Sequence, residues 1–259
     1  MSNPTFMDAV VLFGDSLTEA SAAGSLTQRM AEYYVRRFDV INRGFGGRAI
    51  PVFKHAFATK QAREEGQSQR IKLMTLWFGA NDSVLETEAQ HVPLQRYKEN
   101  LAKIVDLVRS PDSEYHSPDT KIIMITPPPL IADKWAKHLH NLRLERGESD
   151  LDKPSRTAAQ TKQYAEACIQ VAHELGLPVI DIHSKLIQAA GGDDDASLDP
   201  YLYDGLHLTS IGYEVLAKHL IDVIEKVEPK LAAAKVPSRM PPWLEIDPSN
   251  PERALGATA

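Results

Sequence analysis

Short apolar runs recur along this chain and are separated by longer segments that have helical periodicity. The runs are Ala9–Phe13, Val40–Ile41, Ile71–Phe78, Lys121–Thr126 and Pro178–Ile182. A short continuous apolar run bounded by turn residues is typical of a strand that is buried on both faces. Strands that alternate with helices form mainly parallel sheets covered by helices on both sides. The sequence therefore predicts an α/β fold with a five-stranded, mainly parallel sheet, and we expect the flavodoxin-like strand order 2-1-3-4-5.

Four segments between and after these runs have the spacing of amphipathic helices. They are Leu26–Phe38, Leu94–Val108, Thr157–Leu175 and Ser210–Val227. Within the second, apolar residues recur at steps of three and four, which places them on one helical face. Gly176 follows the third segment and Pro229 follows the last, and both residue types commonly end helices.

Two regions interrupt the alternation of strands and helices. Ile131–Arg156 is long and charged and follows the fourth strand, so we expect a lid, a binding loop or a solvated excursion. Residues 231–259 hold five prolines and few core residues. We therefore expect one domain over residues 1–230 and a proline-rich tail over 231–259. Trp243 in the tail is expected to pack against its own domain or against a partner, which makes the tail a candidate contact for a homo-oligomer.

Composition excludes several classes of function. The 259 residues carry a net charge of -6 and no dense Lys/Arg block, which argues against a nucleic-acid partner. No stretch approaches the ~20 apolar residues that span a bilayer. The first residues lack a positive region followed by an apolar one, so we expect no secretory signal and a cytoplasmic protein. Cys168 is the single cysteine, so an intramolecular disulfide is excluded.

The first apolar run leads directly into Gly14, Asp15 and Ser16. Glycine permits a tight change of direction at that point. Ser16 therefore lies just past the carboxyl end of a buried strand, which is the sheet edge where α/β proteins bind ligands. A serine in this position is a candidate nucleophile. The alternative is that Asp15 and Ser16 only cap the helix that follows.

Two further polar clusters follow predicted strands. Asn42–Gly47 contains three glycines in four residues, which fits either a plain turn or a loop whose N–H groups bind an oxyanion. The third strand is followed by Gly79, Ala80 and Asn81. The Asn81 carboxamide can donate hydrogen bonds to a substrate, or it can cap a turn.

A fourth polar cluster, Asp204–His207, precedes the last helix. Histidine is the usual general base for a serine hydroxyl and needs a third group to fix its tautomer. Asp204 can accept from Nδ1 and leave Nε2 of His207 for Ser16. Alone, this pair is equally compatible with a loop cap and a surface imidazole. Together the four clusters supply a nucleophile, oxyanion donors, a base and an orienting acid at one edge of the sheet.

These clusters resemble the four sequence blocks of the SGNH hydrolases, also called the GDSL esterase/lipase family. The matching residues are Gly14–Leu17, Asn42–Gly47, Gly79–Asp82 and Asp204–His207, and they occur in the family's order. With Val92-Pro93-Leu94 added, the set is similar to isoamyl acetate-hydrolysing esterases of fungi within that family. The resemblance implies a three-layer α/β/α fold and carboxyl-ester hydrolysis with neither a metal nor an organic cofactor.

The resemblance also implies a role for each matching residue. Ser16 would be the nucleophile, His207 the base and Asp204 its orienting acid. The N–H groups of Ser16 and Gly47 and the side chain of Asn81 would form the oxyanion hole. The G-x-S-x-G elbow of the α/β-hydrolases is absent around Ser16.

Three residues are candidates for contact with the substrate. Arg48 stands where many relatives have a small polar residue, so it is expected to narrow or charge the mouth of the site. Leu130 and Ile131, which follow three prolines, are candidates for the acyl pocket.

The sequence thus predicts a serine esterase that acts on small carboxylic esters, acetate esters first. A deacetylase of acetylated sugars and a lysophospholipase-like hydrolase are alternatives, because the same site suits all three. A flavodoxin-like binding module is disfavoured by the intact set of site residues. A nucleotide-binding module is disfavoured because no G-x-G-x-x-G or Walker loop follows the first strand.

Overall fold

The strands form a single parallel sheet in a computed structural model that describes residues 7–46, 53–54, 56–148, 154–239 and 241–250. The strands are β1 (Ala9–Gly14), β2 (Asp39–Gly44), β3 (Ile71–Trp77), β4 (Lys121–Ile125) and β5 (Val179–Ile180). Among the described residues the sheet has five strands in the order β2-β1-β3-β4-β5, and every pair is parallel. The predicted α/β class and strand order are confirmed.

Helices cover the sheet and connect its strands. They are α1 (Ser16–Glu19), α2 (Leu26–Tyr33), α4 (Lys60–Glu64), α5 (Leu94–Arg109), α6 (Ala132–Glu145), α7 (Ala158–Glu174), α8 (Ile182–Ala190), α9 (Asp195–Leu198) and α10 (Ser210–Val227), with 3-10 turns at Asp199–Tyr201, Pro229–Leu231 and Trp243–Glu245. The α2 helix ends at Tyr33, earlier than its predicted end at Phe38. Arg36 has a φ of 61°, and this left-handed conformation does not continue an α-helix.

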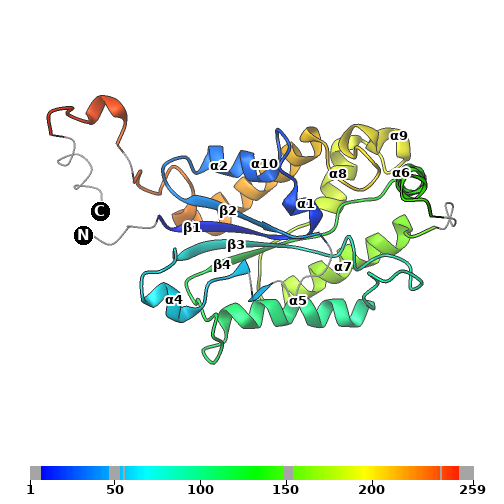
Figure 1. Cartoon of the computed structure of the whole chain (residues 1–259), viewed down its shortest axis with the longest axis horizontal. Helices are drawn as coiled ribbons and strands as arrows, with labels where there is room; N and C mark the ends of the chain where they lie inside the picture. Colours follow the sequence, from blue (N-terminus) through cyan, green and yellow to red (C-terminus); the bar gives the residue numbers. More distant parts are fainter. Residues whose placement is uncertain (1–6, 47–52, 55, 149–153, 240, 251–259) are drawn as a thin grey trace.

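The sheet lies between two layers of helices, with α2, α8 and α10 on one face and α5 and α7 on the other (Figure 1). Successive side chains of a strand point to opposite faces, so β1 contributes to two cores. Val10 and Leu12 pack in the core under α2, α8 and α10, while Val11 and Phe13 pack in the core under α5 and α7. This arrangement is the three-layer α/β/α fold, and it explains why the strands read as apolar runs.

The region 131–156 is more ordered than its charge suggested. Its first part forms α6, whose residue Trp135 is buried, and its last described residues, Ser155 and Arg156, are buried as well. The expectation of a solvated excursion is therefore wrong for the described part of this region. The charged side chains of α6 concealed an apolar spacing, Trp135, Leu139 and Leu142, that places these three side chains on one helical face.

The start of the predicted tail contacts the residues that directly follow α2. The Tyr34 hydroxyl donates to the carbonyl of Leu231 at 3.0 Å, and Nε of Arg37 donates to the carbonyl of Val236 at 3.2 Å. Further on, Trp243 is 75% exposed, so this side chain does not pack against the domain as one of our two expectations had it. A contact with a second copy stays a prediction. Within the described residues, every helix is too short or too polar to cross a bilayer.

Candidate active site

The carboxyl end of β1 places a serine and an aspartate at the sheet edge. Asp15 caps α1, because its Oδ1 accepts from the N–H of Leu17 at 2.9 Å. Ser16 is the first residue of α1, and its Oγ lies 2.9 Å from Nε2 of His207. The capping interpretation thus holds for Asp15, and the hydroxyl of Ser16 has a histidine partner.

Only a glycine can occupy position 14 in this arrangement. A Cβ atom there would lie 2.1 Å from Oγ1 of Thr18 and 2.6 Å from the carbonyl oxygen of Trp77. Real Cβ atoms do not approach other atoms this closely, and one of the two neighbours is backbone. The glycine therefore lets α1 fold back against the end of the sheet and brings Ser16 to its edge.

The turn before α10 holds His207 in one orientation. Nδ1 of His207 lies 2.6 Å from Oδ2 of Asp204. The other carboxylate oxygen of Asp204 accepts from the backbone N–H groups of Leu206 and His207 at 2.9 and 2.8 Å. Burial raises the pKa of Asp204, but the hydrogen bonds from His207 outweigh it and leave the pKa below its usual value. Asp204 is therefore an anion at neutral pH that accepts from Nδ1, and Nε2 faces Ser16.

The start of α6 packs directly on this turn. Ile131 donates its N–H to the carbonyl of Gly205 at 2.9 Å. Gly205 has a φ of 96°, and a Cβ atom on it would lie 2.6 Å from both the Ile131 carbonyl oxygen and the Trp135 nitrogen. The ring of Trp135 meets the His207 ring edge-on with centroids 5.9 Å apart, and Tyr203 stacks on His207 at 5.7 Å. The imidazole is thus enclosed by two aromatic rings.

Asn81 follows β3 and is buried beside an arginine that our sequence analysis did not single out. Its Oδ1 accepts from Nη2 of Arg156 at 3.2 Å. Arg156 also donates through Nη1 to the carbonyl of Ala80, and its guanidinium lies over the Trp135 ring at 5.1 Å. A single arginine in a charged region resembles a surface residue, and only the tertiary packing shows that it is 8% exposed.

Acidic groups surround this arginine. Burial raises the pKa of Asp15 to about 7, with a further contribution from the charge of Asp82. Partial burial raises the pKa of Asp82 to about 6. Burial lowers the pKa of Arg156 to about 10, and the charge of Asp15 opposes that change. Arg156 therefore remains a cation at neutral pH and is the counter-charge of this cluster.

The carboxyl end of β2 reaches the same edge. Nδ2 of Asn42 donates to the carbonyl of Thr18 at 2.8 Å and to Oγ1 of Thr27 at 2.7 Å, which ties the end of β2 to α1 and α2. Gly47 and Arg48, for which we predicted an oxyanion and a substrate role, lie outside the described residues. Leu130 and Ile131 are buried in the hydrophobic core, and their contact with an acyl group stays a prediction.

Comparison with known proteins identifies the family. The model of the GDSL-like Lipase/Acylhydrolase family matches residues 12–215, a range that includes Ser16, Asn81, Asp204 and His207. The chain belongs to this family. It is therefore a carboxylic ester hydrolase, a conclusion that the esterase names of its relatives also support.

Relatives of this esterase are found in animals and plants. The isoamyl acetate-hydrolyzing esterase 1 homolog of Bos taurus is 36% identical over 256 residues, which are 98% of this chain and 94% of the relative. A GDSL esterase/lipase of Arabidopsis thaliana is 33% identical over 254 residues, with 95% and 96% covered. The lipase/acylhydrolase of Enterococcus faecalis shares the fold, with a TM-score of 0.56 at 22% identity over 91% of this chain and all of that one.

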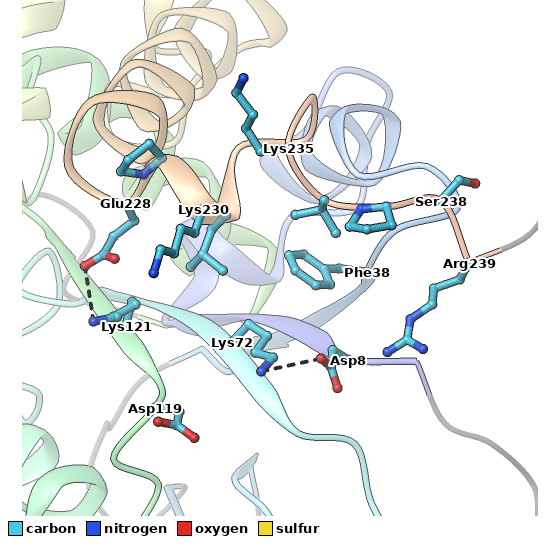
Figure 2. Close-up of a pocket in the computed structure, with 14 residues that line it drawn as sticks. Asp8, Phe38, Lys72, Asp119, Lys121, Glu228, Lys230, Lys235, Ser238 and Arg239 are labelled. Carbon is cyan, nitrogen blue, oxygen red and sulfur yellow. Dashed lines mark ion pairs between the residues drawn. The ribbon is translucent and has the colours of Figure 1, made fainter. Parts of the chain in front are cut away.

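The opposite edge of the sheet also gathers charged side chains, which our sequence analysis did not connect. A groove of about 1010 Å³ lies at the amino ends of the strands and is lined by Asp8, Lys72, Lys121 and Glu228 among others (Figure 2). Two ion pairs cross it, Lys72 with Asp8 at 3.6 Å and Lys121 with Glu228 at 3.7 Å. None of the residues that line this groove belongs to the set around Ser16.

Proposed function

We propose that this esterase hydrolyses short-chain carboxylic esters, acetate esters first, through an acyl-enzyme on Ser16. One observation carries the proposal: the hydrogen bonds that run from Ser16 Oγ to His207 Nε2 at 2.9 Å and from His207 Nδ1 to Asp204 Oδ2 at 2.6 Å. A hydroxyl, an imidazole and a carboxylate in this sequence are the parts of a nucleophile, its base and the group that orients the base.

In the first half of the reaction, Nε2 of His207 takes the proton of Ser16 as Oγ attacks the ester carbonyl. The negative oxygen of the tetrahedral intermediate accepts from the Ser16 N–H and from Nδ2 of Asn81. Family resemblance assigns a third donor to the Gly47 N–H. The protonated His207 then gives its proton to the leaving alcohol, and the carbonyl carbon stays bonded to Ser16 Oγ.

The second half repeats these steps with water in place of Ser16. His207 takes a proton from water, the hydroxide attacks the acyl carbon, and the bond to Ser16 Oγ breaks as His207 returns the proton to it. Asp204 stays ionised throughout, because its lowered pKa favours the carboxylate that stabilises the imidazolium. The names of the relatives from cattle and rat, which specify an acetate ester, support the choice of a short acyl group.

Hydrolysis of p-nitrophenyl esters from acetate to long acyl chains tests this proposal with wild type, Ser16→Ala and the exposed control Ser184→Ala. We expect turnover that is highest on acetate, falls with chain length, is lost in Ser16→Ala and is retained in Ser184→Ala. Equal turnover by Ser16→Ala would contradict the nucleophile. Parallel assays compare turnover on isoamyl acetate with turnover on an acetylated xylose and on a lysophospholipid, which represent the two alternatives. Preference for the sugar or the lysophospholipid would contradict the proposed substrate.

A further inference from the structure

We propose that Arg156 is a positioning residue that fixes the orientation of the Asn81 carboxamide, so that Nδ2 points to the oxyanion. This inference rests on the proposed function, because it concerns the same ester carbonyl. In this proposal Arg156 does not touch the substrate. It acts on the reaction only through Asn81.

Arginine and asparagine differ in which hydrogen-bonding groups they offer. A guanidinium has N–H donors and no acceptor, whereas a carboxamide has one acceptor oxygen and one donor nitrogen. The atom of Asn81 that faces Nη2 of Arg156 at 3.2 Å must therefore be Oδ1. A reversed amide would bring N–H groups against N–H groups beside a buried cation. The arginine thus excludes the orientation in which Asn81 would present its oxygen to a negatively charged intermediate.

Arg156 is itself held in place by its neighbours. Its other terminal nitrogen donates to the carbonyl of Ala80, the residue directly before Asn81, so one guanidinium holds both the backbone and the side chain at this point. The Trp135 ring covers the guanidinium at 5.1 Å, and the indole N–H donates to Oγ of Ser155 at 3.2 Å. A donor that is fixed on several sides needs little reorganisation when charge develops.

The positive charge of Arg156 also acts on the Asn81 amide. Arg156 is 8% exposed, so its charge is weakly screened by water. A cationic donor on Oδ1 draws electron density toward the oxygen and makes the N–H groups of the same amide stronger donors. The guanidinium would therefore raise the stabilisation that Asn81 gives to an oxyanion, in addition to orienting the amide. Both effects require Asn81 to be present.

A double-mutant cycle between Arg156 and Asn81 tests this inference. Asn81→Ala should lower kcat on p-nitrophenyl acetate by about 10²–10³, the usual cost of one oxyanion donor. Arg156→Met keeps an unbranched side chain over Trp135 but removes the donors. We expect it to lower kcat by roughly 10- to 100-fold, which is less than the loss in Asn81→Ala, and to leave KM within about threefold of wild type. In the Asn81→Ala background, Arg156→Met should lower kcat by less than about threefold, since no amide remains to be oriented.

Two further variants separate positioning from folding. Arg156→Lys keeps the charge but lacks the two-pronged donor, so it should have more activity than Arg156→Met and less than wild type. Arg63→Met removes an arginine of the same kind, which lies 5.5 Å over the Phe57 ring and donates to the carbonyl of His116 away from the site. It should change thermal stability but not kcat. If Arg156→Met fails to fold, the cycle is measured with Arg156→Lys instead.

Equal losses from the arginine substitution in both backgrounds would overturn the inference, as would an unchanged kcat in folded Arg156→Met. Ser16→Ala, assayed on the same ester, keeps this result distinct from the proposed function. Turnover by Ser16→Ala at the wild-type rate contradicts the mechanism itself. An inactive Ser16→Ala together with an additive cycle contradicts only the role of Arg156.

Discussion

The two edges of the sheet gather charged side chains, and the two sets differ in how many of their members are buried. At the carboxyl edge, Asp15, Arg156 and Asp204 are buried, and the hydrogen bonds made by Asp204 measure 2.6 to 2.9 Å. At the amino edge, Lys121 and Glu228 keep 49% and 24% of their side chains exposed and stand 3.7 Å apart (Figure 2). Lys121 and Glu228 are therefore partly hydrated, unlike Asp15, Arg156 and Asp204, whereas Asp8 at the amino edge is buried and pairs with Lys72 at 3.6 Å.

Buried and exposed charges should differ in their effect on folding and catalysis. Burying a charged group costs free energy unless it is paired and hydrogen-bonded, whereas an exposed pair in water contributes little. According to the proposed mechanism, Asp204 and Arg156 stay buried at the carboxyl edge because they orient His207 and Asn81. Substitutions at the two edges should therefore differ by orders of magnitude in their effect on kcat.

The largest effect is expected at the carboxyl edge, for Ser16→Ala and His207→Ala. Each should lower kcat by on the order of 10⁶, and by similar factors, because nucleophile and base act as one unit. The double variant should lose little more than either single variant. Single-turnover and steady-state assays on p-nitrophenyl acetate measure these factors. Losses that multiply in the double variant would show that the two residues act independently.

Asp204→Asn should have the next largest effect. Asparagine has a neutral carboxamide in place of the carboxylate that accepts from Nδ1. The imidazole therefore loses both its fixed tautomer and the negative charge that stabilises its protonated form. We expect kcat to fall on the order of 10⁴, less than for His207→Ala, as is found when the equivalent change is made in a serine protease triad. The same assay compares the two variants at one pH. A loss as large as that of His207→Ala would indicate that Asp204 is needed to fold the turn, which a thermal melt of the variant reveals.

The fold and the Ser16 cluster were predictable because they depend on local pattern. Three strands read as apolar runs, and β2 and β5 show only short apolar pairs. The three residues now found in hydrogen-bond contact each follow a strand or precede the last helix. Parallel strands end at one edge, so residues that are far apart in the sequence meet there. Ser16 follows β1 and His207 precedes α10, and the two residues, 191 positions apart, meet at this edge.

Arg156 and α6 were not predictable in the same way. The role of Arg156 depends on Asn81 from β3 and on Trp135 from α6, and no local pattern records such contacts. The helix α6 had a signal, the spacing of Trp135, Leu139 and Leu142, but the many charged residues of this region left a lid, a binding loop and a solvated excursion all open. Tertiary contacts decided both cases, since a charged segment can become a packed helix when one large aromatic residue is buried beneath it.

A third prediction concerns the stability of the carboxyl edge and follows from the pKa of Asp15, about 7 in the folded protein. Because this pKa is raised above its ordinary value of 3.8, the folded state holds the proton more tightly. The resulting stability is fully present below pH 3.8 and is lost as the pH rises through 7. Asp15→Asn keeps an oxygen for the Leu17 N–H and does not titrate. Between pH 5 and pH 8 the wild type should therefore lose about 3 kcal/mol in free energy of unfolding that Asp15→Asn keeps, since one pKa unit corresponds to 1.36 kcal/mol.

Urea unfolding of wild type and Asp15→Asn at both pH values measures this gain. Asp112→Asn, a substitution in an exposed loop, serves as the control. Its free energy of unfolding should differ from that of wild type by the same amount at pH 5 and at pH 8. A difference between Asp15→Asn and wild type that is the same at pH 5 and pH 8 would mean that Asp15 titrates as it does in an unfolded chain.

The smallest effect is expected at the amino edge. Lys121→Met removes one partner of the Lys121–Glu228 ion pair but keeps an apolar side chain of similar length. The free energy of unfolding should change by less than about 1 kcal/mol, because both groups remain partly hydrated, and kcat/KM should stay within about twofold of wild type. Urea unfolding at low and high salt, with esterase assays, gives both quantities. A loss of more than about 2 kcal/mol in free energy of unfolding, or a fall in kcat/KM, would show that the amino edge is coupled to the site through β4. The contrast between the catalytic carboxyl edge and the amino edge would then no longer hold.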